Sequence, residues 1–264
     1  MVATYRQYRP DTVESMAIMR IRVVNPNTTA AMTELAARCA RAVAGPDVVI
    51  ESATSRTGPV SIESHYDEAL ALPGLLAEIA RGEAEGVDGY VIACFGDPGL
   101  YAARESARGP VIGIAEAGMQ AAAHLGRGFS VVTTLARTVG QAEDLAERYG
   151  MRRFCRGVHA TDIPVLELDD PLVRTVIAEA CRDAVAADGS DAVVLGCAGM
   201  AGLCEYLTAE IGVPVVDGVA AATLTVQGLI TMGLRKSGRG EFAAPPPKPY
   251  TGMLSTFGSK GAMP

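Results

Sequence analysis

The chain has 264 residues, of which 49% are hydrophobic and 20% are charged, and its formal net charge is −7 at pH 7. This composition is typical of a compact globular protein and excludes a disordered or fibrous chain. The charge is spread without long blocks of one sign, so nothing favours a nucleic-acid or membrane-surface partner, and no apolar run reaches the roughly 18 to 20 residues that span a bilayer.

The first predicted strand follows an N-terminal extension, residues 1–19, whose polar residues 1–18 lack the apolar centre of a secretion signal. From Arg20 onward, short runs rich in Val and Ile alternate with longer Ala-rich segments of helical periodicity. This alternation predicts βαβ units and parallel sheets. The strands are expected at 20–24, 48–53, 89–93, 111–114, 129–133, 154–160, 192–195 and 213–216.

A last helix is expected at about 220–233, and residues 241–264 form a Pro- and Gly-rich tail that we expect to be extended. The six cysteines are widely and irregularly spaced. Such spacing argues against a disulfide framework and predicts reduced thiols in a cytoplasmic protein.

The two halves of the chain repeat one another. The first half reads VDGYVIACFGDPGL and then GPVIGIAEAG, and the second reads SDAVVLGCAGMAGL and then VPVVDGVAAA. Asp88 precedes Cys94 by six residues, and Asp191 precedes Cys197 by six. The repeat predicts two related half-molecules with the cysteines at equivalent positions, each just past the carboxyl end of a buried strand. Ligands bind at such strand ends, so we expect a site between two lobes.

Paired cysteines suit one kind of chemistry in particular. Inverting a stereocentre by direct proton transfer needs a base on one face of the carbon and an acid on the other. A thiol with a reference pKa of about 8.5 can fill both roles, and a strand-to-helix turn is expected to lower that pKa. We therefore predict that Cys94 and Cys197 share one proton as a thiolate and a thiol. Structural roles are assigned to the other cysteines: Cys39, Cys155, Cys181 and Cys204.

Other chemistries have little support in the sequence. No CxxC or HExxH motif occurs and the three histidines are scattered, so no metal site is predicted. Neither GxGxxG nor GxxxxGK[ST] follows the first strand, which argues against a nucleotide site. A Cys-His hydrolase built from His65 and Cys94 would leave the second cysteine without a purpose.

At these residues the sequence resembles the aspartate/glutamate/hydantoin racemase superfamily, from Met19 to about Gly240. The motifs similar to its hydantoin racemase branch, which includes allantoin racemases, are VVNPNTT (23–29), ACFGDPGL around Cys94, FSVVTTLART (129–138) and GCAGMAG around Cys197. Amino-acid racemases of the superfamily typically read CNT and GCTE at the cysteines. This sequence departs from both, which disfavours free aspartate or glutamate as the substrate.

The resemblance implies an α/β fold of two pseudo-symmetric Rossmann-like lobes, each with a mostly parallel four-stranded sheet flanked by helices, and an active site in the cleft between them. One lobe would comprise residues 20–115 plus 219–240, and the other residues 116–218. The resemblance also implies a homo-oligomer, no cofactor, and a small-molecule substrate of the 5-substituted hydantoin class, with allantoin as a ureido-substituted member.

Removing the C5 proton of a hydantoin builds charge on an enolate oxygen, which needs hydrogen-bond donors already aimed at it. The predicted donors are backbone N–H groups after each cysteine, in Phe95, Gly96, Ala198 and Gly199. Asn25 and Asn27 are predicted to bond the imide edge of the ring, or else to form a turn and helix cap. The corresponding residues of the second lobe are Thr133, Thr134 and Arg137, with helix capping as the alternative for Thr134. Glu116 is predicted to orient ligand or water, or else to be a solvated loop carboxylate.

Two further functions stay open at this point. A maleate-type cis-trans isomerase also uses paired cysteines in this superfamily, one of which adds covalently to the substrate. A non-catalytic small-molecule binding protein with inert cysteines is the other.

Overall fold

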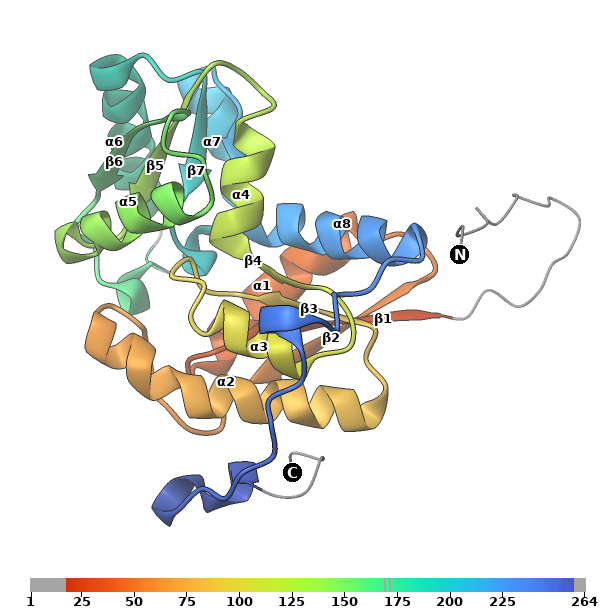
Figure 1. Ribbon diagram of the computed structural model, residues 1–264. Coiled ribbons are helices and arrows are strands. Elements are labelled where there is room, and N and C mark those ends of the chain that lie inside the picture. Colours follow the sequence, from red (N-terminus) through yellow and green to blue (C-terminus); the bar gives the residue numbers. More distant parts are fainter. Residues whose placement is uncertain (1–17, 169, 171, 259–264) are drawn as a thin grey trace, which may run out of the picture.

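The computed structural model describes residues 18–168, 170 and 172–258 (Figure 1). The chain forms two lobes, each built around a four-stranded sheet. Lobe 1 contains β1 (Met19–Asn25), β2 (Val48–Thr54), β3 (Gly89–Ile92) and β4 (Val111–Gly113) in the order β2-β1-β3-β4. Lobe 2 contains β5 (Phe129–Thr133), β6 (Cys155–Ala160), β7 (Ala192–Leu195) and β8 (Val215–Val216) in the order β6-β5-β7-β8. All of these pairings are parallel, and the predicted two-lobed α/β fold is confirmed.

Helices cover both faces of each sheet. In lobe 1 and at its exit they are α1 (Ala30–Val43), α2 (His65–Glu85), α3 (Leu100–Ser106) and α4 (Ile114–Ala122). From lobe 2 onward they are α5 (Val139–Arg148), α6 (Val173–Asp188), α7 (Cys204–Ile211) and α8 (Gly218–Thr231). The 3₁₀ turns are η1 (Ala136–Thr138), η2 (Val165–Glu167), η3 (Ala198–Met200), η4 (Gly240–Phe242) and η5 (Gly252–Gly258). None of the helices in the described part of the chain is long and apolar enough to cross a membrane.

The two aspartates of the sequence repeat have equivalent structural roles. The carboxylate of Asp88 accepts a hydrogen bond from the Arg20 backbone N–H (2.8 Å), and that of Asp191 accepts one from the Arg127 N–H (2.7 Å). Each aspartate therefore anchors the start of the first strand of its own sheet. The fully buried strands β3 and β7 follow these aspartates, and their continuous apolar sequences are typical of parallel strands covered on both faces.

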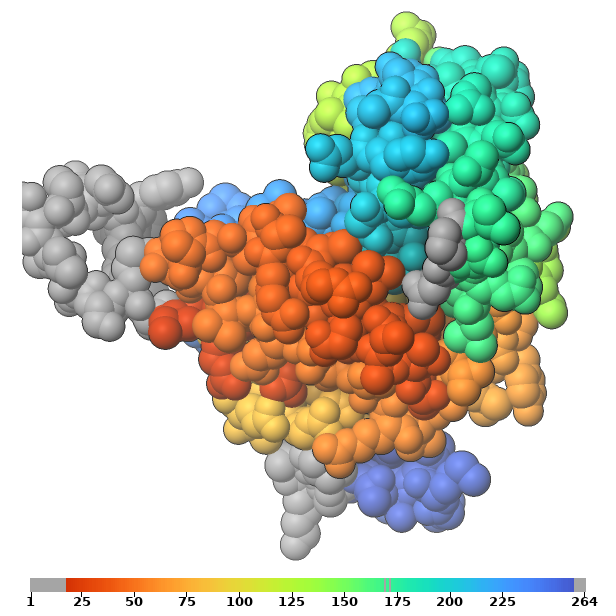
Figure 2. Space-filling view, turned by 180° about the vertical axis from the view of Figure 1, so that it is seen from behind, coloured from red at the N-terminus to blue at the C-terminus, as the bar shows by residue number. Residues whose placement is uncertain are grey.

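Two crossover helices connect the lobes. The chain leaves lobe 1 through α4 and returns through α8, and these two helices pack against each other at Gly118 and Gly218. A Cβ atom on Gly218 would lie 2.4 Å from the Ile114 carbonyl oxygen, so only glycine permits this approach. After this crossing α8 packs on α1, β3 and β4 of lobe 1. Figure 2 shows lobe 2, green to cyan, seated directly against lobe 1, red to yellow.

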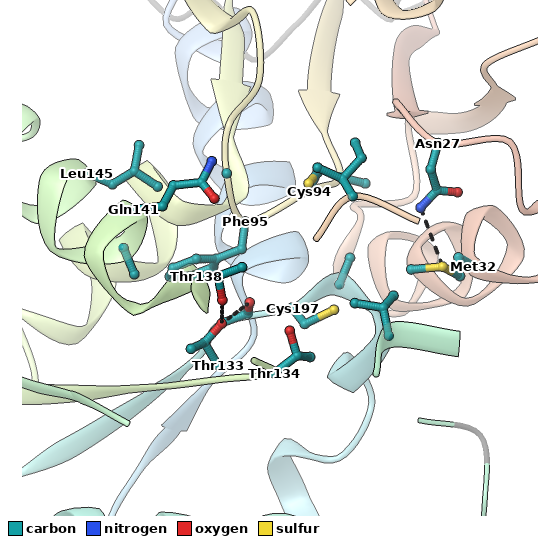
Figure 3. Close-up of a pocket in the computed structure, with 17 residues that line it drawn as sticks. Asn27, Met32, Cys94, Phe95, Thr133, Thr134, Thr138, Gln141, Leu145 and Cys197 are labelled. Carbon is teal, nitrogen blue, oxygen red and sulfur yellow. Dashed lines mark hydrogen bonds between the residues drawn. The ribbon is translucent and has the colours of Figure 1, made fainter. Parts of the chain in front are cut away.

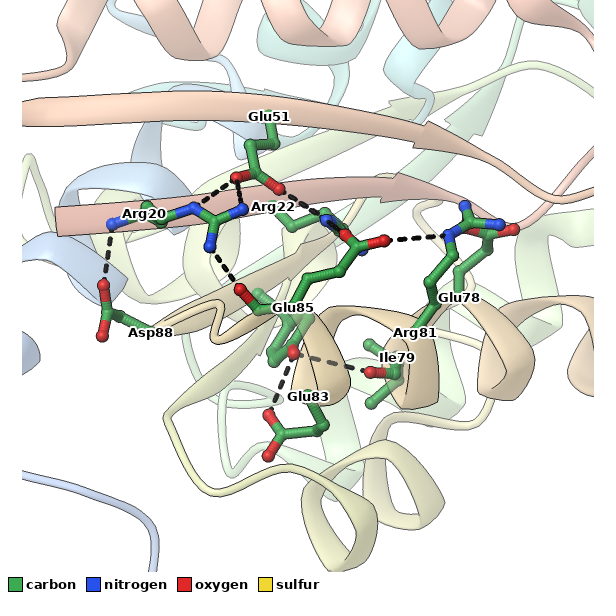
Figure 4. Close-up of polar contacts among 10 residues, drawn as sticks. Arg20, Arg22, Glu51, Glu78, Ile79, Arg81, Glu83, Glu85 and Asp88 are labelled. Atoms are coloured by element: carbon green, nitrogen blue, oxygen red, sulfur yellow. Dashed lines mark hydrogen bonds and ion pairs between the residues drawn. The ribbon is translucent and has the colours of Figure 1, made fainter. Parts of the chain in front are cut away.

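A polar network on lobe 1 fixes α2 against the sheet (Figure 4). The buried Arg22 guanidinium of β1 donates to Glu51 of β2 (2.6 Å) and also pairs with Glu85 at the end of α2. Arg20 donates to the same Glu51 carboxylate (2.6 Å). Because buried charges are stable only when paired and hydrogen bonded, these contacts set the position of α2, whose other end lies near the pocket described below.

The structure describes only part of the predicted N-terminal extension and C-terminal tail. The predicted N-terminal extension, residues 1–19, falls almost wholly outside the described residues. In the tail, Phe242 packs edge-on against Tyr101 of α3 with ring centroids 5.8 Å apart, and most of residues 243–258 are exposed. Figure 1 shows this dark blue segment running past α3 and away from the lobes.

Candidate active site

Cys94 and Cys197 line one pocket between the lobes. Cys94 follows β3, Cys197 follows β7, and both are partly exposed to the pocket. Figure 3 shows the two side chains on opposite sides of it. The other lining residues are Asn27, Met32, Ile62, Ala93, Phe95, Gly96, Thr133, Thr134, Thr138, Gln141, Ala142, Leu145, Val165, Gly196 and Ala198.

The two cysteine loops leave their sheets through matching hydrogen bonds. The Ala93 N–H donates to the Val24 carbonyl (2.9 Å), as the Gly196 N–H donates to the Val132 carbonyl (2.8 Å). Within the loops, the residue three positions after each cysteine donates its N–H to the cysteine carbonyl, at 3.0 Å for Cys94 and 3.1 Å for Cys197. The cysteines therefore occupy equivalent positions in the two lobes.

The expectation that the turns lower the pKa of both thiols is wrong for this structure. Burial raises the pKa of Cys94 to about 12 and that of Cys197 to about 11. The backbone N–H groups of Gly96 and Gly199 act in the predicted direction, but loss of hydration outweighs them. The Gly199 N–H lies 3.4 Å from the Cys197 sulfur. Forming a thiolate in the closed pocket therefore needs additional stabilisation.

Asn25 and Asn27, at the end of β1, have different roles. The buried Asn25 amide donates to the Asn27 Oδ1 (2.8 Å) and to the Thr33 hydroxyl (3.0 Å), so its polar groups are used inside the loop. The Asn27 Oδ1 also accepts from the Thr29 N–H (2.9 Å), whereas its Nδ2 contacts only the Met32 sulfur, at 3.4 Å, among the described residues. Asn25 thus orients Asn27, and Asn27 presents an amide donor to the pocket (Figure 3).

The lobe 2 side of the pocket carries threonine hydroxyls. Thr133 lies 3.3 Å from the Thr138 hydroxyl and donates to the Gly196 carbonyl (3.3 Å), and Thr134 lies beside Cys197 in Figure 3. Thr138 donates to the Leu135 carbonyl (2.8 Å) at the start of α5. These hydroxyls form a polar wall next to the lobe 2 cysteine.

Four predicted site residues do not line the pocket: Asn25, Glu116, Arg137 and Gly199. Glu116 lies in the first turn of α4, because the strand before it ends at Gly113, and it pairs with Arg104 (2.6 Å). Arg137 is exposed on η1. The Gly199 N–H points to the adjacent sulfur instead of the open pocket. His65 is 80% exposed and outside the lining, so no cysteine-histidine pair forms at Cys94.

Several lining residues were not predicted from the sequence, among them Met32, Ile62, Gln141, Leu145 and Val165. Gln141 and Leu145 lie on α5, four residues apart, which places them on one face of the helix. That face also contributes to the core, so its apolar periodicity alone does not separate pocket residues from core residues.

Three polar contacts hold the lobes together around the pocket. The Glu63 carboxylate of lobe 1 accepts from the Val165 N–H of lobe 2 (2.7 Å). The Tyr149 hydroxyl donates to the Asp97 carboxylate (2.8 Å), and the Gln141 amide donates to Glu68. Burial raises the pKa of Glu68. In the described part of the chain, no group of three or more His, Cys, Asp or Glu side chains is arranged to hold a metal ion.

Comparison with known proteins agrees with this architecture. The family model of the Asp/Glu/Hydantoin racemases matches residues 21–226. A hydantoin racemase from Rhizobium meliloti is 48% identical over 229 residues, which cover 86% of this chain and 95% of that protein.

Two solved structures are similar over nearly their whole length. The allantoin racemase from Klebsiella pneumoniae has a TM-score of 0.88 at 49% identity, covering 90% of this chain and 98% of that one. The allantoin racemase from Pseudomonas fluorescens has a TM-score of 0.84 at 39% identity, covering 89% and 100%. The chain is a racemase, and it belongs to the Asp/Glu/hydantoin racemase family.

Proposed function

We propose that this enzyme racemises 5-substituted hydantoins, allantoin among them: one of Cys94 and Cys197 removes the C5 proton, and the other delivers its own proton to the opposite face. One observation carries the proposal: two thiols from equivalent loops of the two lobes face a single pocket from opposite sides. A carbon held between them can lose a proton to one sulfur and gain one from the other, which is what inversion requires.

The proposed proton transfers balance. The thiolate of one cysteine removes the C5 proton and becomes a thiol, leaving an enolate on the adjacent carbonyl. The thiol of the other cysteine then donates its proton to the opposite face of C5 and becomes the thiolate. No group is consumed, and the opposite enantiomer is processed by the reverse transfer.

The polar lining supports a neutral ring as substrate. Among the described residues, none of those that line the pocket is Arg, Lys or His. Carboxylate substrates are usually held by such cations, so free aspartate and glutamate fit this pocket poorly. The Asn27 Nδ2 group can donate to a ring carbonyl, and the backbone N–H groups of Phe95 and Ala198 are the proposed donors to the enolate oxygen. The Gly96 N–H, like that of Gly199, donates to the sulfur of its own loop.

Apolar side chains form the rest of the wall and provide space for the C5 substituent. They are Met32, Ile62, Leu145 and Val165. The similar proteins are named hydantoin racemase and allantoin racemase, which supports a 5-substituted hydantoin, with the ureido group of allantoin as one candidate substituent. The apolar wall favours an alkyl or aryl substituent, and the threonine hydroxyls can form hydrogen bonds to a ureido group.

The maleate-type isomerase is the less favoured alternative. Maleate carries two carboxylates, and a pocket without a lining cation does not neutralise them. A non-catalytic small-molecule binding protein would have inert thiols. Alkylation of both pocket cysteines by iodoacetamide would argue against that function.

A polarimetric panel tests the proposal. Single enantiomers of allantoin, benzylhydantoin, isopropylhydantoin and aspartate are each incubated with enzyme and without it, because hydantoins also racemise spontaneously. We expect at least one hydantoin to lose optical rotation far faster than its blank, and aspartate to keep its rotation. Racemisation of aspartate with every hydantoin unchanged would contradict the proposal.

The homo-oligomer implied by the family resemblance stays a prediction. Light scattering at micromolar concentration measures the mass directly, and a single species at the 27.4 kDa of one chain would contradict it.

A further inference from the structure

The two cysteine loops differ in the third residue after the cysteine. That residue is Asp97 in lobe 1 and Met200 in lobe 2, and both are buried, with 2% and 0% of the residue exposed. Both donate their backbone N–H to the cysteine carbonyl, so the backbone path is shared. Lobe 1 therefore carries a buried carboxyl group in its cysteine loop where lobe 2 carries an apolar side chain.

The carboxyl group of Asp97 caps the crossover helix α4. It accepts from the backbone N–H groups of Ala115 (3.1 Å) and Glu116 (2.9 Å), because Gly113, the N-cap residue, has no side chain. A Cβ atom on Gly113 would lie 2.2 Å from the Asp97 carboxyl carbon.

In lobe 2 the corresponding helix is capped locally. Asp217 is the N-cap residue of α8, and its own carboxylate accepts from the Val219 N–H (2.8 Å). Gly113 is the last residue of β4 and Asp217 directly follows β8, and each is the N-cap residue of the next helix. The capping carboxylate therefore comes from the cysteine loop in lobe 1 and from the N-cap residue in lobe 2. Among the described residues, a capping carboxylate thus ties the cysteine loop to the helix that leads into the other lobe in lobe 1 and not in lobe 2.

Asp97 also joins the cysteine loop to lobe 2 directly. The third donor to its carboxylate is the hydroxyl of Tyr149 (2.8 Å), at the end of α5, the helix that brings Gln141 and Leu145 to the pocket. The backbone of Asp97 has φ of 45°, a left-handed conformation unusual for a residue with a side chain. Three hydrogen bonds to one carboxylate hold this strained residue in place.

Among the described residues, no cation compensates the charge of Asp97: it faces Cys94 in its own loop, Glu116 on α4 and the Tyr149 hydroxyl after α5, and Glu116 is already paired with Arg104. Each thiol also feels one other carboxylate, Glu68 at Cys94 and Glu63 at Cys197, both of which oppose ionisation, so Asp97 is the additional charge on the Cys94 side. Burial raises the pKa of Asp97 to about 7, against the effect of its three donors. Above that pH a buried negative charge lies in the Cys94 loop, and like charge opposes formation of a second anion there.

We propose that Asp97 is a positioning residue for Cys94: it fastens the Cys94 loop to α4 and to Tyr149, and its carboxylate opposes loss of the Cys94 proton, so that Cys197 is the first of the two thiols to ionise. This inference rests on the proposed function in taking these two thiols as the proton carriers. The enantiomer whose C5 hydrogen faces Cys197 then meets the thiol that ionises more readily.

Site-resolved alkylation of the free enzyme tests this assignment. The wild type, Asp97→Asn and Asp217→Asn are treated with iodoacetamide in short pulses from pH 7 to pH 12.5, and the rate at each cysteine is measured by peptide mass spectrometry. The pH midpoint is compared, because a change in access alters the plateau rate and not the midpoint. Asp217→Asn is the matched control, since it removes a half-buried helix-capping carboxylate that is not in a cysteine loop.

In the wild type we expect the lower midpoint at Cys197. In Asp97→Asn the Cys94 midpoint should fall by about one unit, which is about a tenfold faster reaction on the rising limb, while Cys197 changes by less. Asp217→Asn should leave both midpoints unchanged. A lower midpoint at Cys94 in the wild type, or equal Cys94 midpoints in the wild type and Asp97→Asn, overturns the proposal.

The wild-type measurement covers the case in which Asp97→Asn does not fold, as judged by circular dichroism. The order of the two midpoints needs no variant, and a Cys94 midpoint at or below that of Cys197 overturns the proposal. None of these measurements uses a substrate, so a failure of the proposed racemisation is seen separately in the polarimetric panel.

Discussion

The two lobes build the same strand, turn and helix around their cysteines, yet they cap the following helix in different ways. Lobe 2 uses Asp217 at the helix itself, and lobe 1 brings the carboxylate of Asp97 from the cysteine loop. The shared backbone places two thiols on opposite sides of one pocket, and the exchanged carboxylate makes their surroundings unequal. Symmetry of the fold thus supplies the geometry for a two-sided reaction, and one side chain distinguishes the two sides.

The largest expected effect tests the shared geometry. Cys94→Ser and Cys197→Ser should each reduce racemisation by about 10³-fold, because a serine hydroxyl is a far weaker acid than a thiol and proton transfer contributes on the order of 10² to 10⁴. Polarimetry with one enantiomer measures the loss. Cys39→Ala, a half-buried cysteine of α1 outside the pocket, is the control and should retain activity. Near-normal activity in either pocket variant would show that the two lobes do not act as a pair.

The buried carboxyl group of Asp97 should make the stability of the protein depend on pH. Asp97 has a pKa of about 7 in the folded protein and an ordinary value of 3.8, so the folded state binds the proton more tightly. Relative to Asp97→Asn, the wild type should therefore lose stability as pH rises from about 4 to about 7, by about 1.4 kcal/mol per pH unit inside that window.

Urea unfolding of the wild type and Asp97→Asn at several pH values measures this difference. The other buried carboxyl groups are common to both proteins and cancel. A constant difference between pH 4 and pH 8 would mean that Asp97 titrates normally, and the asymmetry between the lobes would then be one of shape alone.

A glycine substitution tests the packing of Gly113 against the Asp97 carboxyl group that caps α4. Gly113→Ala should reduce the free energy of unfolding by about 1 to 3 kcal/mol, because the added methyl group overlaps the Asp97 carboxyl group. Gly140→Ala on α5 is the matched control, with no atom within 4 Å of the added Cβ, and it should be neutral or stabilising by up to about 1 kcal/mol. Equal stability of the Gly113→Ala variant and the wild type would contradict the described cap.

The smallest effect concerns the contact between lobes. Glu63→Gln replaces a charge-assisted hydrogen bond to the Val165 N–H by a neutral one, which weakens it by about 1 kcal/mol. We expect a several-fold increase in KM with a smaller change in kcat, measured by initial-rate polarimetry. Glu34→Gln, on the exposed face of α1, is the control. A change in kcat alone would indicate that Glu63 acts on the chemistry and not on closure.

Most of the fold could be predicted from the sequence because it depends on local patterns. The predicted strands at 129–133 and 192–195 coincide with β5 and β7. The last strand was predicted at 213–216 but comprises only Val215–Val216, because Pro214 has no N–H to donate to a ladder. The equivalence of the two cysteines also followed from the repeat, and the structure places both in one pocket.

The parts of the site that were missed depend on contacts between distant segments. Tyr149 is 52 residues from Asp97 in the chain, and nothing near either residue indicates their hydrogen bond. Glu116 was predicted at the site because the strand before it was expected to end later, and the actual helix start directs it to Arg104. The predicted direction of the thiol pKa shifts was wrong because the burial of a loop depends on the segments that pack around it, which its own sequence does not specify.

The most direct test of the central claim is racemisation of one hydantoin enantiomer in D2O, followed by NMR at C5 and by polarimetry. Two opposed thiols predict that nearly every molecule of product carries deuterium from solvent, while the remaining substrate keeps its hydrogen during the early reaction. Product that retains the original hydrogen, or substrate that exchanges as fast as product forms, would indicate a single base on one face and would contradict the account.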